Sequence, residues 1–456
     1  MIKKVLIANR GEIAVRIIRT CKEMNIQTVA IYSTVDKQSL HVQLADQAIC
    51  VGPASSKDSY LNMNNIIQAA LTTGCDAIHP GFGFLSENAQ FALLVNECGL
   101  VFIGPNTEVI EKMGNKIKAK EMMKQANIPT IPGSDGIVKT QQEAIEIASA
   151  IGFPLIIKAC NGGGGKGMRV VTEIDKVVPA YLSAKSEAKA SFGSDDVYIE
   201  KMFENAKHIE VQIIADQFGN VLHLYERDCS FQRRHQKMIE ETPCHALLPE
   251  VRSSIVEKAI AAAKFANYDN VGTIEFLLDQ NNNFYFLEMN TRIQVEHPIS
   301  EMITGIDLIK CQIIAACKRP LPYKQSDIAI NGHAIECRIN AEDINNNYAP
   351  SPGKITFIHF PGGRNVRIDS AVYNGSIISP FYDSMIAKVI VHGKTRLEAI
   401  KKMRCVLEEL IIDGIKTNTE FHYFVLHHKN FIDGHYTIQF ADQFIKELTV
   451  QNEYIQ

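Results

Sequence analysis

The stretch Phe284-Tyr-Phe-Leu-Glu-Met-Asn-Thr-Arg-Ile-Gln-Val-Glu296 carries a polar side chain at every second position over its second half. These polar residues are Glu288, Asn290, Arg292, Gln294 and Glu296. Successive side chains of an extended strand point to opposite faces, so the pattern predicts five polar groups on one face. A solvated face is the alternative, but Asn and Glu are poor strand formers. We therefore interpret the row as one wall of an active site.

The preceding stretch supports this interpretation. Gly272-Thr-Ile-Glu-Phe-Leu-Leu-Asp279 is joined to it by Gln280-Asn-Asn-Asn283, a polar loop of hairpin length. If Asp279 faces Phe284, then Glu275 lies opposite Glu288. Two carboxylates directly across a ladder lie about 5 Å apart and repel each other. A hard divalent cation would resolve this conflict, so we predict an Mg²⁺ site, with Mn²⁺ as an alternative, at Glu275, Glu288 and Asn290.

Composition limits the class of protein. A chain of 456 residues exceeds a single core, and 46% apolar with 21% charged residues is typical of a globular protein. A net charge of -4 gives no reason to expect nucleic-acid binding. The 11 cysteines form no CxxC pair and indicate reduced thiols. The chain enters a strand at once and has no apolar run of membrane length, so we expect a cytoplasmic protein without a membrane partner.

The order of elements predicts an α/β fold, α+β overall. Short apolar strands at 4–8, 27–32, 77–80 and 101–104 alternate with helical spacing, which favours a doubly wound, Rossmann-like domain over residues 1–114. We expect a second region at 115–330 that includes a small subdomain at about 131–203. A β-rich region at 331–446 follows, with a closing helix near 395–411 and a polar tail at 447–456.

The loop Lys158-Ala-Cys-Asn-Gly-Gly-Gly-Gly-Lys-Gly-Met-Arg169 is the second strong signal. Four consecutive glycines let backbone N–H groups turn toward an anion with no side chains in the way. The loop lacks the Ser or Thr of a P-loop and leads into a strand-like run rather than a helix. It predicts a hairpin flap over phosphates with Lys158 as a charge partner; a mobile surface linker is the alternative.

These features together resemble a known family. The glycine flap, the pair Glu275 and Glu288, and the run from Glu288 to Pro298 resemble ATP-grasp enzymes and, more narrowly, biotin carboxylases. Four further motifs resemble that family: Ile7-Ala-Asn-Arg-Gly-Glu-Ile-Ala14, His79-Pro-Gly-Phe-Gly-Phe-Leu-Ser-Glu-Asn88, Glu226-Arg-Asp-Cys-Ser-Phe-Gln-Arg-Arg-His-Gln-Lys237 and Gly332-His-Ala-Ile-Glu-Cys-Arg-Ile-Asn-Ala-Glu342. The resemblance implies a central ATP-grasp domain with a mobile lid and a β-rich C-terminal biotin carboxylase domain.

The resemblance also implies roles for individual residues. Those expected to bind ATP are Lys116, Lys158, Gly164, Gly165, His208, Gln232, His235, Glu275, Leu277, Glu288 and the adenine-reading hinge Glu200, Lys201, Met202 and Phe203. Those expected to bind bicarbonate or biotin are Lys237, Arg292, Gln294, Val295 through its backbone, Arg338, Phe82 and Gly83. Glu296 would be the general base, and Arg338 would stabilise the enolate-like oxygen of biotin. We further hypothesise that Arg292 keeps Glu296 ionised.

Some residues have a plainer interpretation or depart from the family pattern. Lys116 lies in a Lys-rich helical stretch, where a solvated charge is the ordinary expectation. Cys229 has no base in sequence reach and reads as structural. Phe82 stands where the family typically has Tyr, which removes a hydroxyl near biotin. The other departures are Asn115, Asn161 and Lys166, which keep a polar or flexible character.

The implied activity is Mg-ATP-dependent carboxylation of biotin on a carrier protein, with bicarbonate as the carbon source and carboxyphosphate as the intermediate. This is the first half-reaction of acetyl-CoA carboxylase in fatty acid synthesis, or alternatively of pyruvate or another acyl-CoA carboxylase. The implied partners are a biotin carboxyl carrier protein, carboxyltransferase subunits and a second copy of the chain. The sequence leaves two other classes open: a different ATP-grasp ligase and a nucleotide-sensing subunit without turnover.

Overall fold

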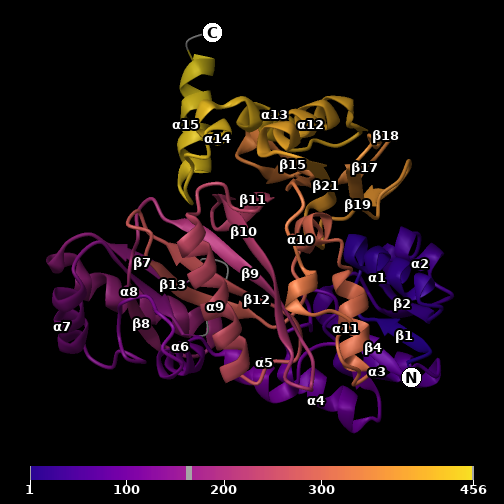
Figure 1. Ribbon diagram of the computed structural model, residues 1–456, viewed down its shortest axis with the longest axis horizontal. Coiled ribbons are helices and arrows are strands. Elements are labelled where there is room, and N and C mark those ends of the chain that lie inside the picture. The colour runs from indigo at the N-terminus through magenta and orange to yellow at the C-terminus, as the bar shows by residue number, and fades with distance from the viewer. Residues whose placement is uncertain (1, 161–166, 454–456) are drawn as a thin grey trace.

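The first structural unit is a parallel sheet in the N-terminal region. A computed structural model describes residues 2–160 and 167–453. The sheet has the order β3-β2-β1-β4-β5 and lies at the lower right of Figure 1. Alternate residues of β1 enter different cores: Val5 and Ile7 pack with α1, whereas Leu6 packs with α3 and α4 on the other face. Helices therefore cover both faces, and the predicted doubly wound fold is confirmed.

The strands of this unit are β1 (Lys4–Ile7), β2 (Gln27–Ser33), β3 (Gln47–Gly52), β4 (Ala77–His79) and β5 (Val101–Phe102). Its helices are α1 (Gly11–Glu23), α2 (Leu40–Leu44), α3 (Met63–Thr72), α4 (Ala89–Glu97) and α5 (Thr107–Gly114), followed by α6 (Lys116–Gln125). Strand β3 was not foreseen from the sequence.

A small unit at the lower left of Figure 1 carries the glycine hairpin. It consists of α7 (Gln141–Ile151), β6 (Leu155–Ala159), β7 (Met168–Val171), α8 (Val177–Phe192) and β8 (Val197–Lys201). Its three strands lie in the order β7-β6-β8. Strands β6 and β7 pair antiparallel with Lys158 opposite Met168, so the stems of the predicted hairpin are present. Gly164, Gly165, Asn161 and Lys166 lie outside the described residues.

One antiparallel sheet forms the centre of the molecule and continues into the C-terminal region. Its order is β13-β12-β9-β10-β11-β14-β21-β19. The strands are β9 (Lys207–Ala215), β10 (Val221–Arg233), β11 (Gln236–Thr242), β12 (Asn270–Leu278), β13 (Phe284–Asn290), β14 (His333–Asn340), β19 (Val366–Ser370) and β21 (Met385–Gly393). Strands β11 and β14 pair with Ile239 opposite Cys337. Backbone hydrogen bonds therefore join residues on either side of position 330.

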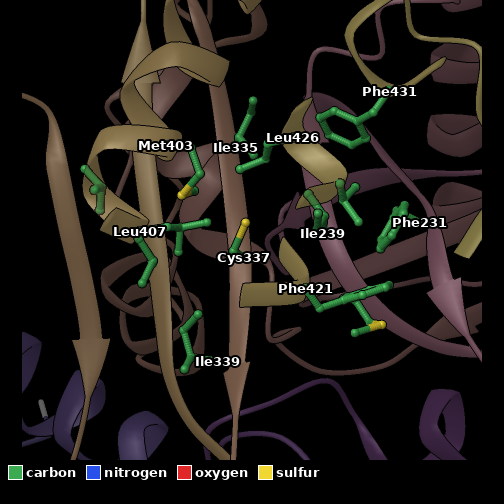
Figure 2. Packing of buried hydrophobic residues seen from close by; sticks show 14 of the residues in the cluster. Phe231, Ile239, Ile335, Cys337, Ile339, Met403, Leu407, Phe421, Leu426 and Phe431 are labelled. Carbon is green, nitrogen blue, oxygen red and sulfur yellow. The ribbon is translucent and has the colours of Figure 1, made fainter. Parts of the chain in front are cut away.

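The hydrophobic core of the C-terminal region also includes residues from both sides of position 330. Figure 2 shows Phe231 and Ile239, from β10 and β11, among side chains that follow residue 330. The helices here are α12 (Arg396–Glu409), α13 (Thr419–His427), α14 (Lys429–Ile432) and α15 (Phe440–Glu453); those of the central region are α9 (Pro249–Phe265), α10 (His297–Thr304) and α11 (Leu308–Ala316). The sequence analysis missed α13, α14 and α15, and α15 continues through residues expected to form a polar tail. Apolar residues of α13 and α14, such as Phe421 and Phe431, are fully covered by this core.

Short two-stranded pairs decorate the C-terminal region: β15 (Glu342–Asp343) with β16 (Ala349–Pro350), β17 (Gly353–Lys354) with β20 (Ile377–Ile378), and β18 (Phe357–His359) with β22 (Ile411–Asp413). Every helix in the described part of the chain is too short or too polar to cross a membrane.

Candidate active site

The centre of the site is an ammonium group that contacts three carboxylates. Lys237 Nζ on β11 lies 2.6 Å from Glu210 Oε2, 2.9 Å from Glu275 Oε1 and 2.7 Å from Glu296 Oε1. The three carboxylates come from β9, β12 and the loop before α10, and all are buried. Charges at these distances attract strongly when water is excluded, so the cluster is held in one geometry.

Sheet register explains why these groups meet. Glu210 pairs with Arg227 on one side and with Glu275 on the other, and Glu275 in turn pairs with Glu288. One lateral row across four strands thus carries one guanidinium and three carboxylates. Side chains in directly opposed positions lie close together, so the row needs cations to be stable. Lys237 and Arg227 supply them.

The pairing of Glu275 with Glu288 was predicted, but the premise behind it was wrong. Phe284 lies opposite Leu278 and not opposite Asp279, and Tyr285 lies opposite Leu277. The register shifts between Phe276 and Glu275, which leaves Leu287 as an extra residue on β13. This β-bulge compensates for the difference of one residue and brings the two carboxylates into opposition.

The polar row at 288–296 was expected on one continuous strand, and this part was wrong. Strand β13 ends at Asn290, and a loop leads from there to α10. The loop nevertheless directs its side chains toward the same place: Asn290 Nδ2 and Gln294 Nε2 donate to Glu275 Oε1 at 2.9 and 2.7 Å. Glu296 reaches Lys237, as described above. A turn, not strand alternation, gathers these groups.

The charge balance around Lys237 sets the state of each carboxyl. Arg338 on β14 donates to Glu240 Oε1 at 2.6 Å and to Glu296 Oε2 at 2.9 Å. Burial by itself would raise the pKa of Glu296, but Lys237, Arg338 and Arg227 lower it well below its ordinary value. Glu296 is therefore ionised at neutral pH.

The pKa of Glu240 is shifted in the opposite direction. Burial raises the pKa of Glu240 to about 7, and the nearby guanidinium of Arg338 only partly offsets that effect. Four carboxyls, those of residues 210, 240, 275 and 296, share the cations Lys237, Arg227 and Arg338. The carboxyls outnumber the cations, so it is favourable for one carboxyl to keep a proton near neutral pH.

Arg292 interacts with the Glu296 charge but is not among the main charges that keep Glu296 ionised. Its Nε donates to Glu87 Oε2 at 2.8 Å, and its Nη2 donates to Asn290 Oδ1 at 2.8 Å. The charges that lower the pKa of Glu296 are those of Lys237, Arg338 and Arg227. Arg292 therefore stands at the rim of the cluster, held by the N-terminal domain through Glu87, with its guanidinium still available to an anion.

The proposed Mg²⁺ ligands offer a donor set that suits a hard cation. Glu275, Glu288 and Asn290 present oxygen atoms on adjacent strands, with Thr273 opposite Asn290 in the same ladder. Lys116 Nζ lies 3.4 Å from Glu288 Oε2, and both side chains are more than a third exposed. Glu288 is the open donor of this set, whereas Glu275 Oε1 and Asn290 Oδ1 accept hydrogen bonds from Lys237 and Arg292. Carboxylate and amide oxygens are nevertheless the donor types that Mg²⁺ takes.

A cavity of about 320 Å³ lies between α6, the small three-stranded sheet and β13, where the residues predicted to bind nucleotide phosphates are found. Its lining includes Lys116, Lys158, Glu200 and Glu288. Lys116 begins α6 because the side chain of Asn115 caps that helix by accepting the N–H groups of Ile117 and Lys118. This departure from the family pattern thus supplies a helix cap.

Within this cavity, Glu200 ties the cations together. Its two oxygens lie 3.1 Å from Lys120 Nζ and 2.9 Å from Lys158 Nζ. These ion pairs lower the pKa of Glu200 against the effect of burial. Lys120 was not foreseen as a site residue.

Two of the backbone N–H groups in the predicted adenine-reading hinge, residues 200–203, are already used in hydrogen bonds within the protein. The amides of Lys201 and Met202 donate to the carbonyls of Pro132 and Pro154 at 2.8 and 3.1 Å. The ring of Phe203 stacks on Tyr285 with centroids 4.8 Å apart. Adenine contacts from this segment would therefore use its carbonyls and the Phe203 amide.

The predicted pocket residues on the central sheet divide into two groups. His208 contacts Glu275 Oε2 at 2.9 Å through Nε2 and Gln232 Nε2 at 3.0 Å through Nδ1, so both belong with the carboxylate cluster. Leu277 is the register partner of His208. His235 lies at the turn between β10 and β11, where much of its side chain is exposed. Partial desolvation of the ring lowers its pKa most, and the nearby charge of Lys158 lowers it further.

The loop expected near biotin is anchored by Asn9. Its Nδ2 donates to the carbonyls of Pro80 and Phe82, both at 2.7 Å. Phe82 is half-buried against the N-terminal core, and Gly83 is exposed with a φ of 69°. The loop is thus fixed by the domain that also supplies Glu87.

Several contributors to the site escaped the sequence analysis. Arg227 is fully buried and donates to Gln212, Ser300, Thr273 and Gln294 in addition to Glu210. Glu240 and Glu210 look like ordinary members of alternating strands, and only the pairing of those strands reveals them. Cys229 is buried, and burial raises the pKa of its thiol, in agreement with a structural role.

An antiparallel sheet with a carboxylate row, and a small three-stranded sheet that borders the same cavity, are typical of an ATP-grasp protein. Three protein-family models match the chain: "Biotin carboxylase, N-terminal domain" at residues 1–110, "Carbamoyl-phosphate synthase L chain, ATP binding domain" at 115–324 and "Biotin carboxylase C-terminal domain" at 336–443. The chain belongs to the biotin carboxylase family of ATP-dependent ligases.

Individual relatives support the same family assignment. The chain is 53% identical to biotin carboxylase 1 of Bacillus subtilis over 445 residues, which are 97% of this chain and 99% of that protein. A crystal structure of biotin carboxylase from Campylobacter jejuni in complex with β,γ-ATP matches with a TM-score of 0.95 and 49% identity, covering 97% of this chain and 99% of the other. The biotin carboxylase domain dimer of Hydrogenobacter thermophilus 2-oxoglutarate carboxylase, with MgADP and bicarbonate, matches with a TM-score of 0.93 and 49% identity, covering 97% and 98%.

Proposed function

We propose that this protein carboxylates biotin on a carrier protein, using ATP, Mg²⁺ and bicarbonate, through carboxyphosphate. The observation that carries the proposal is the convergence of Glu296, Lys237 and Arg338 in one buried cluster. A carboxylate that stays ionised between two cations can take the proton of a bicarbonate ion that those cations attract. The domains expected at 1–114, 115–330 and 331–446 would supply the biotin loop, the nucleotide site and Arg338 respectively.

The first chemical step makes a leaving group from a weak nucleophile. Bicarbonate, bound by Lys237, Arg292 and the Val295 amide, attacks the γ-phosphorus of ATP while Glu296 accepts its proton. The bond from that phosphorus to the β,γ-bridging oxygen breaks, and ADP leaves. Mg²⁺ held by Glu275, Glu288 and Asn290 would neutralise phosphate charge. Lys116 and Lys158 position the phosphates, because phosphoryl transfer needs alignment and charge neutralisation more than covalent help.

The second step transfers the carboxyl group to biotin. The carboxyl carbon of carboxyphosphate bonds to the ureido nitrogen of biotin as its bond to phosphate breaks, and the departing phosphate takes the proton of that nitrogen. Arg338 stabilises the negative charge that develops on the ureido oxygen. In this structure the same guanidinium contacts Glu240 and Glu296, so its position is fixed before biotin arrives. Closure of the glycine hairpin would keep water from carboxyphosphate.

The proposal is tested by ATP hydrolysis measured against bicarbonate, with and without free biotin. We expect hydrolysis that requires bicarbonate and is accelerated by biotin. Glu296→Gln should lower this rate by about 10²- to 10⁴-fold, the usual contribution of a general base. Arg292→Ala should also lose most turnover while the nucleotide still binds. The matched control is Glu257→Gln on the exposed side of α9.

Hydrolysis that is independent of bicarbonate would favour a different ATP-grasp ligase. Unchanged bicarbonate-dependent turnover in Glu296→Gln would contradict the assignment of the base. Failure of any turnover, with normal nucleotide binding, would favour a nucleotide-sensing subunit.

The parent complex is a separate question. We infer a cytoplasmic, homodimeric subunit that serves a biotin carboxyl carrier protein and carboxyltransferase subunits of acetyl-CoA carboxylase in fatty acid synthesis. The alternative is a 2-oxo-acid carboxylase, because a biotin carboxylase subunit of pyruvate carboxylase matches with a TM-score of 0.84 and 50% identity. Purification of the protein with its natural partners, followed by assay with acetyl-CoA and with pyruvate, separates the two.

A further inference from the structure

A fully buried lysine outside the cluster described above contacts the loop that carries the base. Lys388 lies on β21 with no solvent exposure. Its Nζ donates to the carbonyl oxygen of Val295 at 2.8 Å and lies 3.0 Å from Glu12 Oε1. Glu12 belongs to the first turn of α1, within the 7–14 motif that has no part in the chemistry proposed so far. The N-terminal and C-terminal regions thus meet at the Val295 carbonyl.

The two peptide groups on either side of the Val295 α-carbon are both held from outside the site. The carbonyl of Gln294 accepts a hydrogen bond from His297 Nδ1 at 2.7 Å. Burial lowers the pKa of His297 well below its ordinary value, so the ring is neutral and Nδ1 carries its proton. Lys388 holds the next carbonyl. In the part of the chain that the structure describes, no hydrogen bond uses the Val295 N–H.

Burial of the Lys388 ammonium has a large desolvation cost, so the groups that it contacts indicate its role. Asp369 Oδ2 lies 3.8 Å from Lys388 Nζ, but this carboxylate is already paired with Arg367, which donates to both of its oxygens. Glu12 is therefore the nearest counter-ion, and the buried carboxyl of Glu336 also interacts with the Lys388 charge. An apolar side chain would fill the same space with no desolvation cost, so stability alone does not explain a lysine here. The group that a lysine serves and an apolar residue would not is the Val295 carbonyl.

We propose that Lys388, with Glu12 as its counter-ion, is a positioning residue of the bicarbonate subsite. It fixes the Val295–Glu296 peptide and so keeps the Glu296 carboxylate beside Lys237. Together with the bond from His297 to the Gln294 carbonyl, it also holds the neighbouring peptide so that the Val295 N–H faces the anion. This inference rests on the proposed function, because it assigns bicarbonate to the Val295 amide. Lys388 touches neither nucleotide nor bicarbonate and acts through the loop.

The test compares KM for bicarbonate with KM for ATP in Lys388→Met. We expect KM for bicarbonate to rise between about tenfold and a hundredfold, as for loss of one charged hydrogen bond. KM for ATP and Mg-nucleotide binding should change less than about twofold. Lys402→Met is the matched control, because Lys402 also donates to a carbonyl of β21, that of His392, away from the loop.

A second variant separates positioning from damage by an unpaired charge. Lys388→Met alone leaves Glu12 buried without its cation, whereas Lys388→Met with Glu12→Gln removes both charges. We expect the double variant to recover thermal stability but to keep the raised KM for bicarbonate. It also carries the test if the single variant does not fold.

Recovery of the bicarbonate KM together with stability would overturn the proposal, and so would an equal rise in both KM values. These outcomes are distinct from failure of the proposed function. That failure would appear in the unmodified protein, as ATP hydrolysis that ignores bicarbonate.

Discussion

The two ends of the active site are built in different ways. Lys237 is 13% exposed and pairs with three carboxylates that are 5% exposed or less. Lys116 and Glu288, at the nucleotide end, are 40% and 37% exposed, and their charged atoms lie 3.4 Å apart. Burial strengthens the first set of charges and screening weakens the second. The Lys237 cluster, proposed to bind bicarbonate, is therefore held together by buried charges, whereas the Lys116–Glu288 pair beside the proposed nucleotide cavity is solvated and weakly held.

Substitution of each lysine by methionine tests this difference and has the largest expected effect. Lys237→Met leaves buried carboxylates without their common cation and should lower the free energy of unfolding by about 3–5 kcal/mol. Lys116→Met removes a solvated pair and should cost less than about 1 kcal/mol. Urea unfolding at neutral pH measures both. Equal losses of stability in the two variants would show that burial does not distinguish the two ends.

A second prediction concerns the seam between β11 and the C-terminal helices, where Glu241 contacts His333, Arg396 and Tyr436. Burial would raise the pKa of Glu241, but Arg396 and His333 lower it well below its ordinary value. The folded protein then holds this proton less tightly than the unfolded chain, so stability is full above about pH 5 and falls as the pH decreases.

Glu241→Gln removes this linkage. The variant should be less stable at neutral pH, and its stability should fall less steeply below about pH 5, by up to about 1.4 kcal/mol per pH unit. Urea unfolding of both proteins between pH 7 and pH 4 provides the measurement. Parallel curves would mean that Glu241 is not ionised in the folded state.

The smallest expected effect is at the loop that is proposed to contact biotin. Phe82→Tyr adds the hydroxyl that the family pattern has at this half-buried position. One neutral hydrogen bond contributes about 1 kcal/mol, so KM for free biotin should fall by no more than about fivefold, with unfolding unchanged. A larger change would place this ring in direct contact with the reacting group.

The hairpin shows how far local sequence could predict the site. The opposition of Glu275 and Glu288 was foreseen, although the register was misread by one residue and a bulge at Leu287 restored it. The polar row ending at Glu296 was recognised as one wall of the site, but its strand stops at Asn290. The alternation of polar residues correctly indicated which side chains line one cavity. It did not indicate where the strand ends, because that depends on the loop and helix that follow.

The sequence by itself determined the fold class, the family and most of the polar residues, because strand periodicity, glycine runs and spaced motifs are local properties of the chain. Only the tertiary structure placed Glu210, Arg227 and Glu240 around Lys237 and Arg338, and Glu12 beside Lys388. Charge compensation of a buried group depends on which strands become neighbours. The energy of that arrangement is shared among residues hundreds of positions apart, so no local pattern records it.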